Sequence, residues 1–173
     1  LPTGRKSSST PCVANGKVFS AGSTHAHCLD AITGKRIWSV ELPSKGAASS
    51  FLVAGGKAFI MAGKLFVIDI ESGKEAWRSN EISASSSSPV LWETGGEQFI
   101  ILNTRKNISC VNPATGSVIW TAPGGGDSTP AINGAWMAVY CKDIKTGLAG
   151  YKISASGAKQ LWKLPLDARR TQS

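Results

Sequence analysis

Two histidines are the residues whose type and spacing come nearest to a metal site. His25 and His27 stand two residues apart in a stretch with strand character, so both imidazoles would face the same side of a sheet. A metal ion needs a third ligand, and Cys28 would point to the opposite side. Thirty-nine residues further on, the matching positions hold Lys64 and Phe66, which cannot repeat the pair. We therefore predict no metal site and keep His25 and His27 as the only candidate ligands.

Glycine-rich and serine-rich stretches do not form a catalytic group. Gly124-Gly125-Gly126 has the composition of a phosphate-binding loop, but no Lys-Ser/Thr pair follows it, and no helix is expected there. We interpret it as a flexible connector. The serines at 7–9 and 85–88 have no nearby base that would activate a hydroxyl. We therefore predict no catalytic residue.

The cysteines are more consistent with packing than with chemistry. Cys12, Cys28, Cys110 and Cys141 contain no Cys-x-x-Cys pair, so neither a zinc site nor a thioredoxin-type site is indicated. Cys28 and Cys110 hold equivalent places in the first and third repeats, and the second repeat has the apolar Val67 at that place. This favours the interpretation of both cysteines as small buried side chains. A Cys12–Cys28 disulfide stays open, and so does the redox compartment.

A ten-residue stretch occurs four times and organises the chain. Each copy leads from an apolar residue through a short polar residue and a glycine to a tryptophan, and the tryptophans step by 39, 43 and 42 residues. A period near forty is typical of repeat folds. The polar residue and the glycine suit a tight turn, so we assign them a structural role in preference to calcium binding. The members are Asp30, Gly34 and Trp38; Asp69, Gly73 and Trp77; Asn112, Gly116 and Trp120; and Gly157 and Trp162, where Ser154 takes the place of the acid.

A second hairpin signal precedes each copy. Asn15-Gly16, Gly55-Gly56, Gly95-Gly96 and Asn133-Gly134 each separate short apolar runs. Each repeat therefore predicts two hairpins, that is, four short strands, and such units are the blades of a β-propeller. We predict an all-β fold of four four-stranded antiparallel blades at about 11–43, 47–80, 88–122 and 130–164. A β-sandwich is the alternative, but it would not need equivalent residues in successive strand pairs.

The run Asp-x-x-Thr/Ser-Gly-x-x-x-Trp resembles the repeat of quinoprotein-like (PQQ-like) β-propellers, from Ser9 to about Leu164. The resemblance implies that the four repeated tryptophans tie neighbouring blades together. It also implies a bacterial protein outside the cytoplasm. The family includes calcium- and quinone-dependent alcohol and sugar dehydrogenases, a scaffold lipoprotein of the outer-membrane assembly machinery, and sensor domains attached to membrane kinases. Trp92 and Trp136 lie outside the repeat, and we expect both to pack between blades.

Propellers of this family usually have seven or eight blades, so we expect the 173 residues to be a fragment of a longer propeller. A closed four-bladed ring is one alternative. A homodimer whose two half-rings complete an eight-bladed ring is the other. No apolar stretch approaches the length of a membrane span, so any membrane attachment would lie in missing sequence.

The net charge of +8 comes from nineteen Lys and Arg against eleven Asp and Glu. These basic residues are scattered and form no run of five, so we predict a solvated surface and no nucleic-acid partner.

The functional expectation is a non-enzymatic scaffold that binds a protein partner or the remaining blades, and for which no cofactor is predicted. The alternatives are part of a dehydrogenase that would hold PQQ and calcium in the full-length parent, or the ligand-sensing domain of a membrane kinase. The repeat alone does not separate these classes, because a fold does not determine a function.

Overall fold

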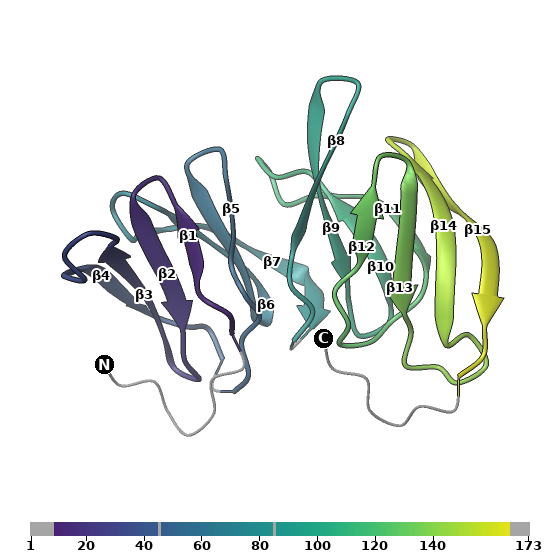
Figure 1. Ribbon diagram of the computed structural model, residues 1–173, viewed down its shortest axis with the longest axis horizontal. Helices are drawn as coiled ribbons and strands as arrows, with labels where there is room; N and C mark the ends of the chain where they lie inside the picture. The colour runs from purple at the N-terminus through teal and green to yellow at the C-terminus, as the bar shows by residue number, and fades with distance from the viewer. Residues whose placement is uncertain (1–8, 45, 85, 167–173) are drawn as a thin grey trace. The chain divides into compact units, whose positions relative to one another are not determined.

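The computed structural model describes residues 9–44, 46–84 and 86–166 of the chain (Figure 1). Within these residues the protein is all-β, with fifteen strands in four antiparallel sheets. Each sheet is built from one sequence repeat and has its strands in chain order, as a propeller blade does. The predicted fold class is confirmed.

The four blades, numbered in chain order, have the following strands. Blade 1 contains β1 (Cys12–Ala14), β2 (Lys17–Ala21), β3 (His25–Asp30) and β4 (Arg36–Glu41). Blade 2 contains β5 (Leu52–Ala54), β6 (Lys57–Asp69) and β7 (Glu75–Ala84). Blade 3 contains β8 (Val90–Thr94), β9 (Glu97–Asn103), β10 (Asn107–Val111) and β11 (Val118–Pro123). Blade 4 contains β12 (Ala131–Asn133), β13 (Trp136–Tyr140), β14 (Leu148–Ser154) and β15 (Gly157–Leu164).

Blade 2 departs from the expected four separate strands. Its β6 is one stretch of 13 residues whose start pairs with β5 and whose later part, from Gly63, pairs with β7. Gly63 has φ of 75°, a conformation open to glycine and costly for other residues. The second and third strands expected from the sequence therefore meet at Gly63 with no loop between them.

The first two strands of each blade form a hairpin, and the glycines at its turn determine the turn type. In blade 1 both Asn15 and Gly16 have positive φ, at 50° and 69°, which is the type I′ geometry that matches the twist of the strands. Gly55-Gly56 and Gly95-Gly96 turn in the same way. In blade 4 only Gly134 has positive φ at its turn, as type II′ requires.

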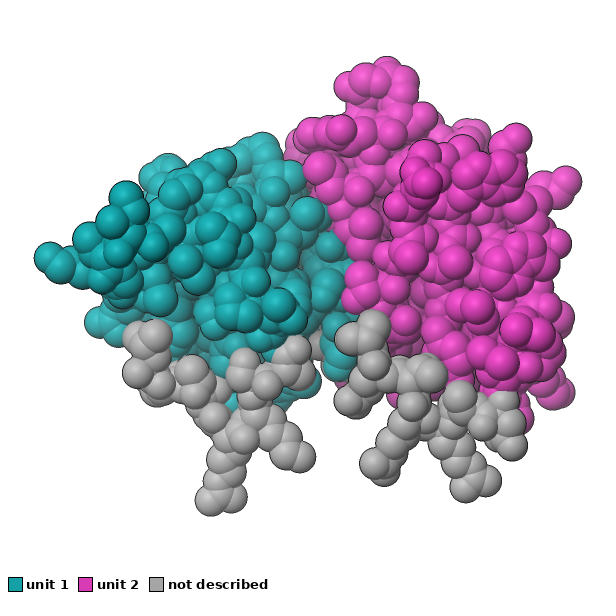
Figure 2. Space-filling model, in the orientation of Figure 1, with its two compact units in different colours: residues 1–89 teal, residues 90–173 magenta. Residues whose placement is uncertain are grey.

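The chain divides into two compact units, residues 1–89 and residues 90–173 (Figure 2). The first unit contains blades 1 and 2 and the second contains blades 3 and 4. Each unit has its own hydrophobic core, and each core lies between its two blades.

Alternation along the strands gives each blade two faces. We call the face that carries the repeated tryptophan the exit face and the opposite one the entry face. In the first unit the exit face of blade 1 packs against the entry face of blade 2, and in the second unit blade 3 packs against blade 4 in the same way. The first core includes Phe19, Cys28 and Trp38 against Ile60, Phe66 and Ile68, and the second includes Ile101, Cys110 and Trp120 against Met137, Tyr151 and Ile153.

Candidate functional site

The repeated acids lie in the turns between the last two strands of their blades, which we call the outer turns. They accept hydrogen bonds from those turns. One carboxylate oxygen of Asp30 accepts from the backbone N–H of Ile32 at 3.2 Å and from the N–H and hydroxyl of Thr33, both at 2.7 Å. Asp69 does the same with Glu71 and Ser72. The bonds from the turn residue three positions on, Thr33 or Ser72, hold the pKa of each carboxyl below its usual value.

The other two outer turns vary this arrangement. Asn112 accepts from the N–H groups of Ala114 and Thr115 through its amide oxygen. Gly34, Gly73 and Gly116 close these three turns with φ of 66°, 70° and 76°. Gly157 instead pairs with Ser154 across a two-residue turn.

In blade 4 the structure corrects the alignment that put Ser154 in the place of the acid. Gly150 lies opposite Trp162, as Cys28 lies opposite Trp38, so the residue two positions later, Lys152, takes the structural place of Asp30. Ser154 lies two residues beyond that place, because the outer hairpin of blade 4 is longer. The equal sequence spacing hid this extension.

Two of the repeated tryptophans join neighbouring blades. Trp38 is buried, and its indole N–H donates to the carbonyl oxygen of Ile70 in blade 2 at 2.9 Å. Trp120 is also buried and donates to the carbonyl oxygen of Ser154 in blade 4 at 3.1 Å. Each indole therefore ends on the backbone of the outer turn of the next blade.

The other two repeated tryptophans differ. Trp77 packs edge-on against Phe59 of its own blade, with ring centroids 6.1 Å apart, and its indole nitrogen has no hydrogen-bond partner among the described residues. Trp162 is 48% exposed and lies against Gly150 of its own sheet, where a Cβ would overlap the indole.

The histidine pair lies on β3 with parallel rings, 6.1 Å between centroids. His25 shares a hydrogen bond with the Thr24 hydroxyl, and His27 is buried. Across residues 9–44, 46–84 and 86–166, no group of three or more His, Cys, Asp or Glu is placed to hold a metal ion.

All four cysteines are free, so Cys12 and Cys28 form no disulfide. Burial raises the pKa of Cys28 to about 11 and of Cys110 to about 12, and it also raises the pKa of Cys141. These thiols are neutral at physiological pH and serve as core side chains.

The glycine triplet is not the flexible connector that its composition predicts. Asn103, which is fully buried, accepts from the N–H of Gly125 at 3.0 Å and donates to the carbonyl oxygens of Ser128 and Tyr140. A Cβ at Gly125 would lie 2.9 Å from the backbone of Lys106. Glycine is needed here for close packing, and no local pattern in the sequence indicates that Asn103 would hold it.

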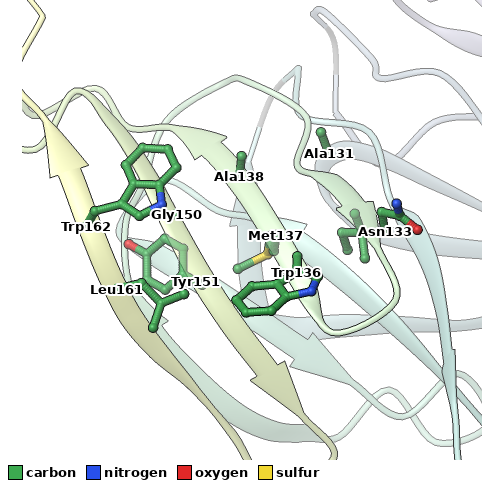
Figure 3. Close-up of a pocket in the computed structure, with 10 residues that line it drawn as sticks. Ala131, Asn133, Trp136, Met137, Ala138, Gly150, Tyr151, Leu161 and Trp162 are labelled. Atoms are coloured by element: carbon green, nitrogen blue, oxygen red, sulfur yellow. The ribbon is translucent and has the colours of Figure 1, made fainter.

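The exit face of blade 4 has the largest exposed aromatic side chains of the described residues (Figure 3). Trp136 on β13 is 57% exposed, against the expectation that it packs between blades, whereas Trp92 is buried and donates to the carbonyl oxygen of Gly134. Trp136, Trp162 and Leu161 border a groove of about 320 Å³.

Small residues make the floor of this groove. Ala131, Ala138 and Gly150 lie side by side on β12, β13 and β14. The same places hold Cys12, Phe19 and Cys28 in blade 1. The face of blade 4 is therefore hollow at its centre, with an indole on each side. An alignment of the repeats by strand register would have revealed this difference.

One positive charge accompanies the groove. The Lys152 ammonium lies 5.9 Å from the centre of the Trp136 ring, within the range of a cation–π contact. Apart from Asn133, the described residues that line the groove are apolar or aromatic, and no cluster of acids or bases is among them. Such a lining suits contact with another protein better than chemistry on a small substrate.

Comparison with known proteins identifies the repeat. The family model described as outer membrane protein assembly factor BamB matches residues 2–171. No curated protein sequence matches the chain.

Three solved structures illustrate the shared fold. BamB from Moraxella catarrhalis is 22% identical, with a TM-score of 0.68 over 87% of this chain and 48% of its own. Quinohemoprotein alcohol dehydrogenase from Comamonas testosteroni is 17% identical, with a TM-score of 0.68 over 90% of this chain and 34% of its own. The computationally designed Ika4 protein is 12% identical, with a TM-score of 0.67 over 87% of this chain and 94% of its own.

The chain thus spans about half the length of the BamB structure and a third of the dehydrogenase. Identities this low show the shared propeller fold alone. Among the described residues there is no helix of the length and apolar character needed to cross a membrane.

Proposed function

Because the chain belongs to the PQQ-like propeller family described as outer membrane protein assembly factor BamB, we propose that it is a non-enzymatic scaffold that binds another protein outside the cytoplasm. The observation that carries the proposal is the exit face of blade 4, where two indoles and Leu161 surround a groove with a floor of small residues. Exposed tryptophans around an apolar hollow are typical of protein–protein contact sites.

The donor chemistry of the described residues supports a role without quinone or calcium. A calcium site takes six to eight oxygen ligands, with carboxylates among them. The repeated carboxylates of Asp30 and Asp69 already accept three hydrogen bonds each from their own turns. In each of these two carboxylates all three bonds fall on one oxygen, which is thereby engaged in its turn, and the proposal assigns no step to quinone or calcium.

Site-specific crosslinking tests this function. A photoreactive phenylalanine analogue at Trp136 is expected to yield a discrete adduct with a partner protein, whereas the same analogue at Ile144, which is exposed on the β13–β14 loop, is expected to yield none. The identified partner is then purified and titrated against the chain. Trp136→Ala should weaken binding at least about tenfold, as loss of a central interface tryptophan does. Quinone- and calcium-dependent oxidation of an alcohol by the chain, without a protein partner, would contradict the proposal.

A further inference from the structure

The contact between blades 1 and 2 shows how one exit face is matched by the blade that covers it. The Trp38 indole donates to the carbonyl oxygen of Ile70 and lies over Gly73, where a Cβ would be 2.6 Å from the ring. Beside it, the ammonium of Lys17 pairs with the carboxylate of Glu71 at 2.8 Å. In this contact the exit face is thus matched by one backbone acceptor, one glycine and one complementary side chain, all in a single outer turn.

Blade 1 presents a turn of the same construction. Its Asx turn has the same length and hydrogen bonds as that of blade 2, and its glycine has φ of 66° against 70°. The carbonyl of Ala31 corresponds to that of Ile70, and Gly34 corresponds to Gly73. A Cβ at Gly34 would have no atom of the described residues within 4 Å, so among these residues nothing fills over Gly34 the place that Trp38 fills over Gly73.

The complementary side chains also correspond. In blade 4 the position of Lys17 is held by Trp136, since each begins the second strand of its blade. In the turn of blade 1 the position of Glu71 is held by Ile32, which is 94% exposed. An ion pair between blades 1 and 2 is thus replaced by an apolar pair on these two faces, and burial of such a pair is favourable.

The sizes of the central side chains match as well. Blade 1 places the large Phe19 in a core that includes the small Ala58 of blade 2. On the exit face of blade 4 and the entry face of blade 1 the larger side chain is on the entry face instead. Blade 4 has the small Ala138 in the place of Phe19, and blade 1 has the larger Val18 in the place of Ala58. The hollow exit face of blade 4 is therefore matched by a larger central side chain on the entry face of blade 1.

From these correspondences we propose that the exit face of blade 4 docks the entry face of blade 1 of a second copy of this chain. Trp162 leaves Gly150, donates to the Ala31 carbonyl oxygen of the second copy and covers Gly34, while Trp136 packs on Ile32. The proposal rests on the proposed function, because it names the protein that the groove receives. The contact is head-to-tail, because it joins two different surfaces of the chain.

Sedimentation of the purified 173-residue chain across a concentration series tests this docking. We expect reversible association that Trp136→Lys and Ile32→Glu each weaken at least about tenfold, as loss of a buried interface anchor does. Ile144→Glu is the matched control, because it changes an exposed isoleucine outside both faces and should leave association unchanged. Circular dichroism of each variant verifies that the blades stay folded.

The double variant tests which residues face each other. Trp136→Lys with Ile32→Glu rebuilds the Lys17–Glu71 ion pair at the equivalent place and should recover part of the lost association, more at low salt than at high salt. A chain that is monomeric at all concentrations would overturn the docking, as would association that Ile32→Glu leaves unchanged or a double variant no better than the singles. A monomer whose Trp136 still crosslinks to a different protein would overturn the docking and leave the proposed function intact.

Discussion

The indole nitrogen of Trp38 donates a hydrogen bond of 2.9 Å to the carbonyl oxygen of Ile70 in the next blade. Both residues are buried in the first core. Replacement by Phe keeps an aromatic ring but leaves the carbonyl without its donor, which should cost about 1 kcal/mol of unfolding free energy. Replacement by Ala removes the ring as well and should cost about 3–5 kcal/mol. Urea unfolding measures both, and a Phe variant as stable as the unchanged chain would contradict a separate contribution of the hydrogen bond.

Gly73 and Gly34 allow the backbone and packing effects of one substitution to be separated. Both have positive φ, so Gly→Ala strains both turns, at a cost of about 1 kcal/mol or more. Only at Gly73 would the new Cβ meet an indole, that of Trp38. Gly73→Ala should therefore destabilise the chain by a further ~1–3 kcal/mol, the usual cost of overpacking. The comparison is made by urea unfolding at a dilution at which the chain is monomeric, and equal losses would show that the indole does not fix this turn.

The sequence predicted the blades because each signal in it is local. A turn that needs positive φ and a tryptophan at a fixed distance can be read without knowledge of the neighbours, as at Asp30 and Trp38. The sequence could not predict the hydrogen bonds of Asn103, because its partners lie 22 to 37 residues away. Nor could it predict the long outer hairpin of blade 4, because the spacing between Ser154 and Trp162 is the usual one. Exposure of Trp136 was missed because it depends on what covers the sheet and not on the residue itself.

Asn103 should be among the most sensitive polar positions of the second unit. Asn103→Ala leaves the buried N–H of Gly125 and two carbonyl oxygens without their partner, and each buried unpaired group costs about 1–3 kcal/mol. We expect a loss of about 3 kcal/mol or more in urea unfolding. Asn133→Ala, at an exposed asparagine of the same unit, should stay within about 0.5 kcal/mol. Similar effects of the two variants would contradict the role of Asn103 in holding the glycine triplet.

Asp69 should make the stability of the chain depend on pH in the acid range. The folded state lowers the pKa of this carboxyl, so its contribution is complete above the unfolded value of about 3.9 and is lost as pH falls through the lower folded value. Asp69→Asn, which imitates the natural Asn112, should reduce this acid sensitivity, and Asn112→Asp should increase it. Urea unfolding at pH 7 and pH 3 measures both. An unchanged difference between the two pH values in either variant would contradict the assignment.

The buried thiols should be inert in the folded chain. Cys28, Cys110 and Cys141 are buried and have raised pKa values, so the reactive thiolate is scarce. At pH 8 an aromatic disulfide reagent should label at most one thiol quickly, that of the half-buried Cys12, and all four after addition of denaturant. The Cys12→Ser variant is the control and should lose the fast phase. Rapid labelling of two or more thiols in the folded chain would contradict the two cores.

Oxidative footprinting of the six tryptophans tests most directly whether the exit face of blade 4 is an open contact surface. In dilute monomeric chain, Trp136 and Trp162 should be oxidised fastest and Trp38, Trp92 and Trp120 slowest, in line with their exposure. Occupation of the face by a protein partner or a second copy should then protect Trp136 and Trp162. Slow oxidation of both in the dilute monomer, or no protection when a protein is bound, would contradict the account.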